Sequence, residues 1–219
     1  MTPAEIAQWN RDLRAKSPRE ITHWAVAQGS GHTIVSTNFR PYEAVVLDLC
    51  VKELPDIPVL WVDHGYNRPA TYKHAEELRS RLNLILKPFL PLISAAHRDA
   101  VFGPPPSMDD EAGLKEFSAM MKLEPFQRGM KALAPKVWIT ALRKSQNPNR
   151  AELDIVSFDR NFAALKVNPV FHLSDADMEA YLQEHDLPNE WDYFDPAKAD
   201  EKRECGLHAT WGAEAMKRA

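Results

Sequence analysis

Short apolar runs alternate with amphipathic segments over the first half of the chain. Residues 32–36 and 57–62 are rich in β-branched positions and predict two buried strands, and residues 84–86 predict a third. Apolar positions at helical spacing after Pro41 and after Pro69 predict a helix between successive strands. This order of strands and helices is typical of a parallel sheet covered by helices, so the pattern predicts an α/β fold.

Capped helices precede this core and further elements follow it. Thr2 and Ser17 each stand before a proline with a glutamate three residues on, which predicts two helices within residues 1–30. Residues 88–121 lack a clear period and predict a surface excursion with one or two short helices. The remaining expected elements are a helix from Glu124 to about Ala134, a strand over 137–140, short strands near 153–158 and 163–168, and a helix from Ser174 to about His185.

The overall composition limits the class of protein and its location. Hydrophobic residues make up 44% and charged residues 26% of the 219 residues, which is typical of one soluble globular domain. No apolar run approaches the roughly 18 residues that cross a bilayer, and the first residues show no secretory pattern. The net charge of -4 argues against general nucleic-acid binding. We therefore expect a cytoplasmic protein that binds neither membrane nor nucleic acid.

Polar turns follow the first two predicted strands, and ligands of parallel sheets bind at the carboxyl ends of strands. Backbone N–H groups of residues 36–39, at a helix start, would bind an anion, although Ser and Thr there also serve as ordinary helix caps. Residues 63–66 offer acceptors for a base or a ribose, or form an ordinary turn. The residues alone leave both alternatives open for each turn.

A cationic stretch lies between residues 122 and 150, where seven Lys or Arg accompany a single acid, Glu124. In an acidic chain this stretch is the candidate surface for an anionic ligand. Arg143 and Arg150 lie in a loop after a predicted strand and would bind a phosphate or sulfate bidentately. The alternative is a solvated loop, which the lack of nearby acids makes less favourable.

The two cysteines stand in different settings. Cys50 falls among apolar residues of a predicted helix and is expected in the core. Cys205 follows two cations, Lys202 and Arg203, and precedes His208 by three positions, a setting that favours a nucleophilic thiolate. The alternative is a solvated tail with an incidental cysteine. The eight histidines show no metal-ligand spacing, so we expect no metal site.

Together these residues resemble the phosphoadenosine phosphosulfate (PAPS) reductase family. The segment Lys-Arg-Glu-Cys-Gly-Leu-His at residues 202–208 matches the catalytic C-terminal motif of that family. Four further segments are also similar to parts of that family. Residues 35–39 resemble its phosphate-binding loop and residues 62–72 its second nucleotide loop. Residues 122–125 resemble its Lys-Val-Glu-Pro stretch and residues 141–150 its arginine loop. Arg40 replaces the usual loop glycine, and the segment between residues 191 and 202 is shorter than usual.

The resemblance implies an adenine nucleotide alpha hydrolase-like (Rossmann-like) fold with a mobile C-terminal tail. It implies that the Cys205 thiolate attacks the sulfur of PAPS, giving S-sulfocysteine and adenosine 3′,5′-bisphosphate, after which thioredoxin or glutaredoxin releases sulfite. A homodimer is also implied. The implied substrate-binding residues are Ser36, Thr37, Asn38, Phe39, Arg40, Asp63, Gly65, Lys122, Arg143, Gln146, Arg150, Lys202, Arg203 and His208.

The resemblance also implies a division of the chain and limits the cofactor. N-terminal helices in residues 1–30 would pack on a nucleotide-binding domain of residues 31–196, followed by a catalytic tail of residues 197–219. Related adenylyl sulfate (APS) reductases hold an iron–sulfur cluster with paired cysteines, and this chain has none between 50 and 205. We therefore expect no bound cofactor and PAPS as the substrate. The alternatives are a cluster-free APS reductase, a nucleotidyl transferase and a non-catalytic nucleotide-binding protein on the same fold.

Overall fold

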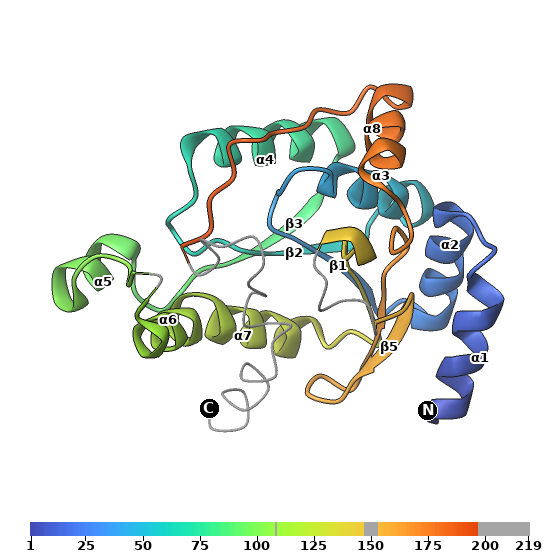
Figure 1. Cartoon of the computed structure of the whole chain (residues 1–219), viewed down its shortest axis with the longest axis horizontal. Helices are drawn as coiled ribbons and strands as arrows, with labels where there is room; N and C mark the ends of the chain where they lie inside the picture. The colour runs from blue at the N-terminus through green and yellow to red at the C-terminus, as the bar shows by residue number, and fades with distance from the viewer. Residues whose placement is uncertain (108, 147–152, 197–219) are drawn as a thin grey trace.

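The structure is a computed structural model that describes residues 1–107, 109–146 and 153–196 (Figure 1). Five residues of the predicted site lie outside the described residues, and they are Arg150, Lys202, Arg203, Cys205 and His208. Their predicted roles therefore remain predictions. The division of the chain into three segments likewise stays a prediction.

A six-stranded sheet forms the centre of the protein, in the order β3-β2-β1-β4-β6-β5. Its strands are β1 (Thr33–Thr37), β2 (Pro58–Val62), β3 (Ile85–Phe89), β4 (Val137–Ile139), β5 (Val156–Asp159) and β6 (Ala164–Val167). All neighbouring strands are parallel except β5 and β6, which form an antiparallel pair at one edge. The predicted parallel α/β sheet is confirmed. Because β1 has β2 on one side and β4 on the other, the loops after β1 and β4 diverge at a topological switch point.

Helices connect and cover these strands. They are α1 (Pro3–Leu13), α2 (Pro18–Gly29), α3 (Glu43–Glu53), α4 (Pro69–Leu82), α5 (Ala95–Phe102), α6 (Glu111–Ser118), α7 (Glu124–Leu133) and α8 (Asp175–Glu184). Thr2, Ser17 and Ser174 each form a capping box at the start of a helix, as expected from a hydroxyl followed three residues later by an acid. The surface excursion contains α5 and α6, which agrees with the prediction of one or two short helices.

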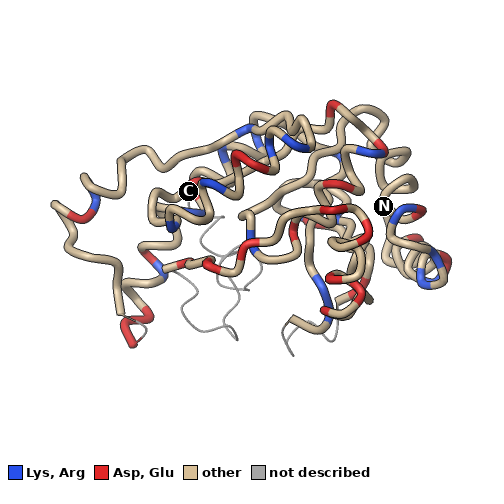
Figure 2. The backbone as a smooth tube through the Cα atoms, turned by 90° about the horizontal axis from the view of Figure 1, so that it is seen from above, with Lys and Arg blue, Asp and Glu red and all other residues tan. Residues whose placement is uncertain are grey.

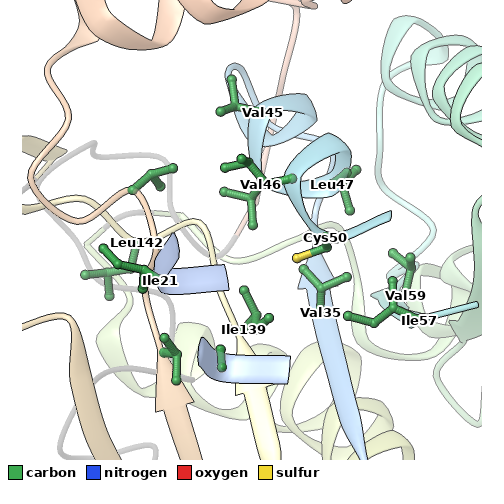
Figure 3. Close-up of a cluster of buried hydrophobic side chains, with 14 of the residues drawn as sticks. Ile21, Val35, Val45, Val46, Leu47, Cys50, Ile57, Val59, Ile139 and Leu142 are labelled. Carbon is green, nitrogen blue, oxygen red and sulfur yellow. The ribbon is translucent and has the colours of Figure 1, made fainter. Parts of the chain in front are cut away.

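Alternate residues of the central strands face two separate apolar clusters. Val35 of β1 belongs to the larger cluster, with side chains of α2, α3, α4 and α8, and Figure 3 shows it beside Cys50 of α3. Its neighbour Ile34 belongs to the second cluster, with Phe126 of α7 and Trp138 of β4. Cys50 is fully buried and burial raises the pKa of its thiol, so the expected core role is confirmed.

Helix α7 lies close against the sheet because it carries a glycine at the contact. A Cβ on Gly129 would lie 2.5 Å from Leu60 and 3.0 Å from Phe89, which is closer than side-chain atoms approach one another. Leu60 belongs to β2 and Phe89 ends β3, so both side chains would have to shift to admit a Cβ at this position of α7. Helix α7 begins at Glu124, directly after the segment that carries Lys122.

Basic and acidic residues are interspersed along the described backbone (Figure 2). Within the described ranges, no helix is both long enough and apolar enough to cross a membrane.

Candidate functional site

The loop after β1 holds a carboxylate of the chain itself. The backbone N–H groups of Asn38 and Arg40 donate to Glu43 Oε2 at 2.7 and 3.3 Å, and the hydroxyl of Thr37 donates to the same oxygen at 2.8 Å. Glu43 is the first residue of α3, where the helix dipole favours a negative charge. The anion-binding groups predicted here exist, but in this state Glu43 is their anion.

The other predicted residues of this loop stabilise its shape. Ser36 Oγ accepts a hydrogen bond from Trp138 Nε1 at 2.8 Å, which ties β1 to β4. Phe39 is fully buried and packs edge-on against Trp61, with ring centroids 5.1 Å apart. Its φ of 54° is unusual for a large side chain, and its N–H donates to Thr37 Oγ1 at 3.0 Å. We therefore see Ser36 and Phe39 as residues that hold the loop in place.

The loop after β2 is organised around Asp63. Asp63 Oδ1 accepts hydrogen bonds from the N–H of Gly65 at 3.0 Å, from Asn67 Nδ2 at 3.0 Å and from the hydroxyl of Tyr72 at 2.8 Å. Gly65 has a φ of 78°, which a residue with a Cβ adopts poorly. Burial and the bond to Asp63 together raise the pKa of Tyr72 to about 12. Three hydrogen bonds to one carboxylate oxygen therefore hold the shape of this turn.

Lys122 lies on a short π-helix, Ala119–Leu123, between α6 and α7. Such segments often occur at functional sites because the wider turn shifts side chains out of the helical register. The Lys122 ammonium pairs with the carboxylate of Asp195, and these side chains are only 5% and 3% exposed. The sequence placed Lys122 in the site and missed Asp195, which lies 73 residues further along the chain.

His64 lies beside this buried pair, and the sequence analysis did not include it in the site. It is almost fully buried, and its Nδ1 accepts a hydrogen bond from the N–H of Tyr66 at 3.1 Å. Burial, followed by the charge of Lys122, lowers the pKa of His64 to about 4, while Asp195 and Asp63 oppose this shift. The ring is therefore neutral near pH 7, with its proton on Nε2. The sequence did offer one sign that His64 belongs to the site, because it stands between the predicted site residues Asp63 and Gly65 at the end of a strand.

Arg143 follows β4 and is buried, although it lies in a polar loop. Its guanidinium donates to Asp175 at 2.6 Å and to the carbonyl of Leu173 at 3.5 Å, and it lies 5.2 Å from the ring of Tyr42. Its Nε is buried and has no hydrogen-bond partner among the described residues. The backbone N–H of Arg143 donates to Gln146 Oε1 at 3.1 Å, so the structure brings these two predicted residues together.

These contacts correct one inference from the sequence. The stretch from residue 122 to 150 looked uncompensated because it contains a single acid. In the structure, distant acids compensate Lys122 and Arg143, which pair with Asp195 and Asp175. Arg143 is also not part of a solvated loop, since its side chain is only 5% exposed.

A segment that we call the strap, residues 189–195, crosses the carboxyl edge of the sheet. Figure 1 shows the chain running from α8 along α4 toward the end of β2. Asn189 Oδ1 accepts from the N–H of Tyr42 at 2.8 Å, and Trp191 packs edge-on against the Tyr42 ring at 5.2 Å. Arg68 lies 5.5 Å from the ring of Phe194 and pairs with Asp192. The strap therefore contacts the loops after both β1 and β2.

Beneath the strap lies a cavity of about 520 Å³. Its lining includes two arginines, Arg40 and Arg143, and four aromatic residues, Tyr42, Trp191, Tyr193 and Phe194. Arg40, Arg143 and Gln146 are the predicted site residues that line it, and Lys122 is linked to it through Asp195. Asp175 and Asp195 also line the cavity, so its formal charges balance. The guanidinium donors and the aromatic rings suit a ligand that carries both an anionic group and a planar ring.

Metal ligands are not gathered in the described part of the chain. Among residues 1–107, 109–146 and 153–196 there is no group of three or more His, Cys, Asp and Glu side chains placed to hold an ion.

The parallel sheet with polar loops at its carboxyl edge defines an α/β protein with an adenine nucleotide alpha hydrolase-like fold. The crystal structure of a phosphoadenylyl-sulfate reductase from Candida auris in its phosphate complex superposes with a TM-score of 0.74 at 23% identity, over 86% of this chain and 89% of that one. An FMN adenylyltransferase from Candida glabrata shares the fold at a TM-score of 0.53 and 14% identity, over 75% of this chain and 54% of that one.

Sequence comparison identifies the family. The profile of the phosphoadenosine phosphosulfate reductase domain matches residues 32–191. A phosphoadenosine 5′-phosphosulfate reductase of Alkalilimnicola ehrlichii is 35% identical over 86% of this chain and 76% of its own length. One from a Synechococcus species is 30% identical over 93% of this chain and 97% of its own. The chain belongs to the phosphoadenosine phosphosulfate reductase family, as the sequence motifs indicated.

Proposed function

We propose that this protein reduces PAPS to sulfite and adenosine 3′,5′-bisphosphate. Family membership and the names of relatives that match most of the chain support this reaction. The structural observation that carries the proposal is Arg143, buried at the cavity with an Nε that has no partner among the described residues. A buried guanidinium donor without a partner is costly, and an anionic ligand in the cavity would satisfy it.

The reaction has two steps. The thiolate of Cys205 attacks the sulfur of PAPS, a new S–S bond forms, and the S–O bond to phosphate breaks to release adenosine 3′,5′-bisphosphate. A thiolate of reduced thioredoxin or glutaredoxin then attacks Cys205 Sγ, and sulfite leaves as a mixed disulfide forms. The second thiol of the reductant resolves that disulfide, which returns Cys205 to its thiolate and leaves the reductant oxidised.

The remaining site residues bind and neutralise the polyanion. Arg40, Arg143 and Gln146 line the cavity and offer donors to phosphate and sulfate oxygens. The aromatic residues of the cavity offer flat surfaces for the adenine ring. The site residues that the structure does not describe would surround the thiolate and the leaving phosphate, and they are Arg150, Lys202, Arg203 and His208. Cytoplasmic location and a homodimer belong to the same proposal.

A Cys205→Ser variant tests the mechanism. We expect it to bind adenosine 3′,5′-bisphosphate as the wild type does and to form no sulfite, because a serine hydroxyl cannot form the S-sulfocysteine intermediate. Mass spectrometry after mixing with PAPS should show a sulfonate adduct on Cys205 of the wild type and none on the variant. Cys50→Ala is the matched control, since Cys50 is fully buried, and it should keep the adduct.

Sulfite formation by Cys205→Ser at the wild-type rate would contradict the mechanism. The same assay with APS in place of PAPS separates the two substrates, and adduct formation from APS alone would replace PAPS in the proposal. Release of pyrophosphate from ATP with no adduct from either sulfate would instead favour a nucleotidyl transferase.

A further inference from the structure

The buried pair of Lys122 and Asp195 differs from the other ion pair of the strap. Arg68 and Asp192 are 50% and 47% exposed, whereas Lys122 and Asp195 are 5% and 3% exposed. An exposed pair contributes little and exchanges readily with water and salt. A buried pair holds both side chains in place, because separating them leaves each charge unpaired where little water can solvate it.

Asp195 also lines the cavity beneath the strap. Lys122 does not line the cavity but pairs with Asp195, so an anionic group of a ligand that reached the Lys122 ammonium would meet the Asp195 carboxylate there. Two anions that approach one ammonium compete for it, and the repulsion between them is strong where water is scarce. The pair of Arg143 and Asp175 costs less free energy to separate, because Asp175 is 71% exposed.

We propose that Asp195 is a positioning residue that holds Lys122 in the ligand-free protein and competes with the anionic groups of the substrate for it. Binding of the polyanion transfers Lys122 from Asp195 to the ligand and releases the strap at this anchor. Ligands with too little negative charge to displace the carboxylate bind poorly, so Asp195 contributes to selection of a polyanion. This inference deepens the proposed function and depends on it for the identity of the ligand.

Calorimetric titration of Asp195→Asn with adenosine 3′,5′-bisphosphate and, separately, with pyrophosphate tests the inference. We expect the variant to bind the bisphosphate about tenfold more tightly than the wild type, because the competing charge is gone. Asp195→Glu keeps the charge and should bind like the wild type. Asp192→Asn, the matched control on the same strap, should also leave binding unchanged. A purely structural role for Asp195 predicts weaker or unchanged binding in Asp195→Asn, and either result would overturn the proposal.

A structure of the wild-type protein with bound bisphosphate gives a second test that needs no variant to fold. In that complex we expect Lys122 to contact the ligand and Asp195 to have moved away from Lys122. Persistence of the Lys122–Asp195 pair in that complex would overturn the inference. If the wild type binds pyrophosphate but no bisphosphate, the proposed function fails, while tighter pyrophosphate binding by Asp195→Asn would still support the inference.

Discussion

Two regions of the carboxyl edge place an acid against groups that are suited to bind an anion, and they do so in different ways. In the loop after β1, Glu43 accepts from the N–H of Asn38 and from the hydroxyl of Thr37, six residues before it. At the strap, Asp195 pairs with Lys122 from 73 residues away. The first arrangement is local and partly exposed, and the second is distant and buried.

The difference shows which part of the site is fixed by local chemistry. An acid at the first turn of a helix is stabilised by free N–H groups and by the helix dipole, so the bonds of Glu43 depend only on residues of its own loop. The Lys122–Asp195 pair instead joins residues 73 apart in the sequence, so it depends on the position of the strap. We therefore expect substitutions at the second region to have the larger effects.

Lys122→Met gives the largest expected effect. The buried Asp195 carboxylate would lose its pair with the Lys122 ammonium, and we expect the free energy of unfolding to fall by about 4 kcal/mol. Urea denaturation followed by fluorescence measures this change. The double variant Lys122→Met/Asp195→Leu should recover most of the loss, because it removes both charges and fills the same space.

The exposed pair on the same strap provides the control. Arg68→Met removes the partner of Asp192, and we expect a loss below about 1 kcal/mol, because both side chains are half exposed. Equal losses in Lys122→Met and Arg68→Met would mean that burial does not distinguish the two pairs.

The sequence predicted the parts of the fold that depend on neighbouring residues. The capping box of Ser17 and the start of α4 at Pro69 follow from three or four adjacent positions, and both are found as expected. The central strands β1, β2 and β4 were recognisable because each is a short apolar run that is buried in the parallel part of the sheet.

The electrostatic partners could not be predicted in the same way. Asp175 and Asp195 lie in segments whose local pattern gives no sign of Arg143 or Lys122, and only the folded chain brings these charges together. The π-helix that carries Lys122 adds a residue to a helical turn, and no local motif marks it. Motif resemblance named the cations, while their counter-ions needed the structure.

His64 makes the stability of the folded protein depend on pH. Its folded pKa of about 4 lies below the ordinary value of 6.5, so the folded state binds fewer protons than the unfolded state between these values. The stability that neutral His64 contributes is complete above pH 6.5 and is lost as the pH falls toward 4. The loss amounts to about 3 kcal/mol. Urea unfolding at pH 7 and at pH 4 should therefore show a larger difference for the wild type than for His64→Gln.

The comparison of these two proteins isolates His64, because carboxylates and the other histidines titrate in both. His74 is a relevant case, since burial lowers its pKa as well. An identical pH dependence in wild type and His64→Gln would show that the imidazole is not held neutral beside Lys122.

The smallest expected effect belongs to the loop after β1. Glu43→Gln keeps an oxygen that accepts the N–H bonds but loses the charge, and we expect the free energy of unfolding to fall by about 1 kcal/mol. Glu76→Gln on α4 is the matched control, because Glu76 and its partner Arg79 are both exposed. This substitution should lower the free energy of unfolding by only about 0.3 kcal/mol. A loss of stability from Glu43→Gln as large as that from Lys122→Met would contradict the distinction between the local and the distant acid. The β1 loop would then depend on its carboxylate as strongly as the strap depends on Asp195.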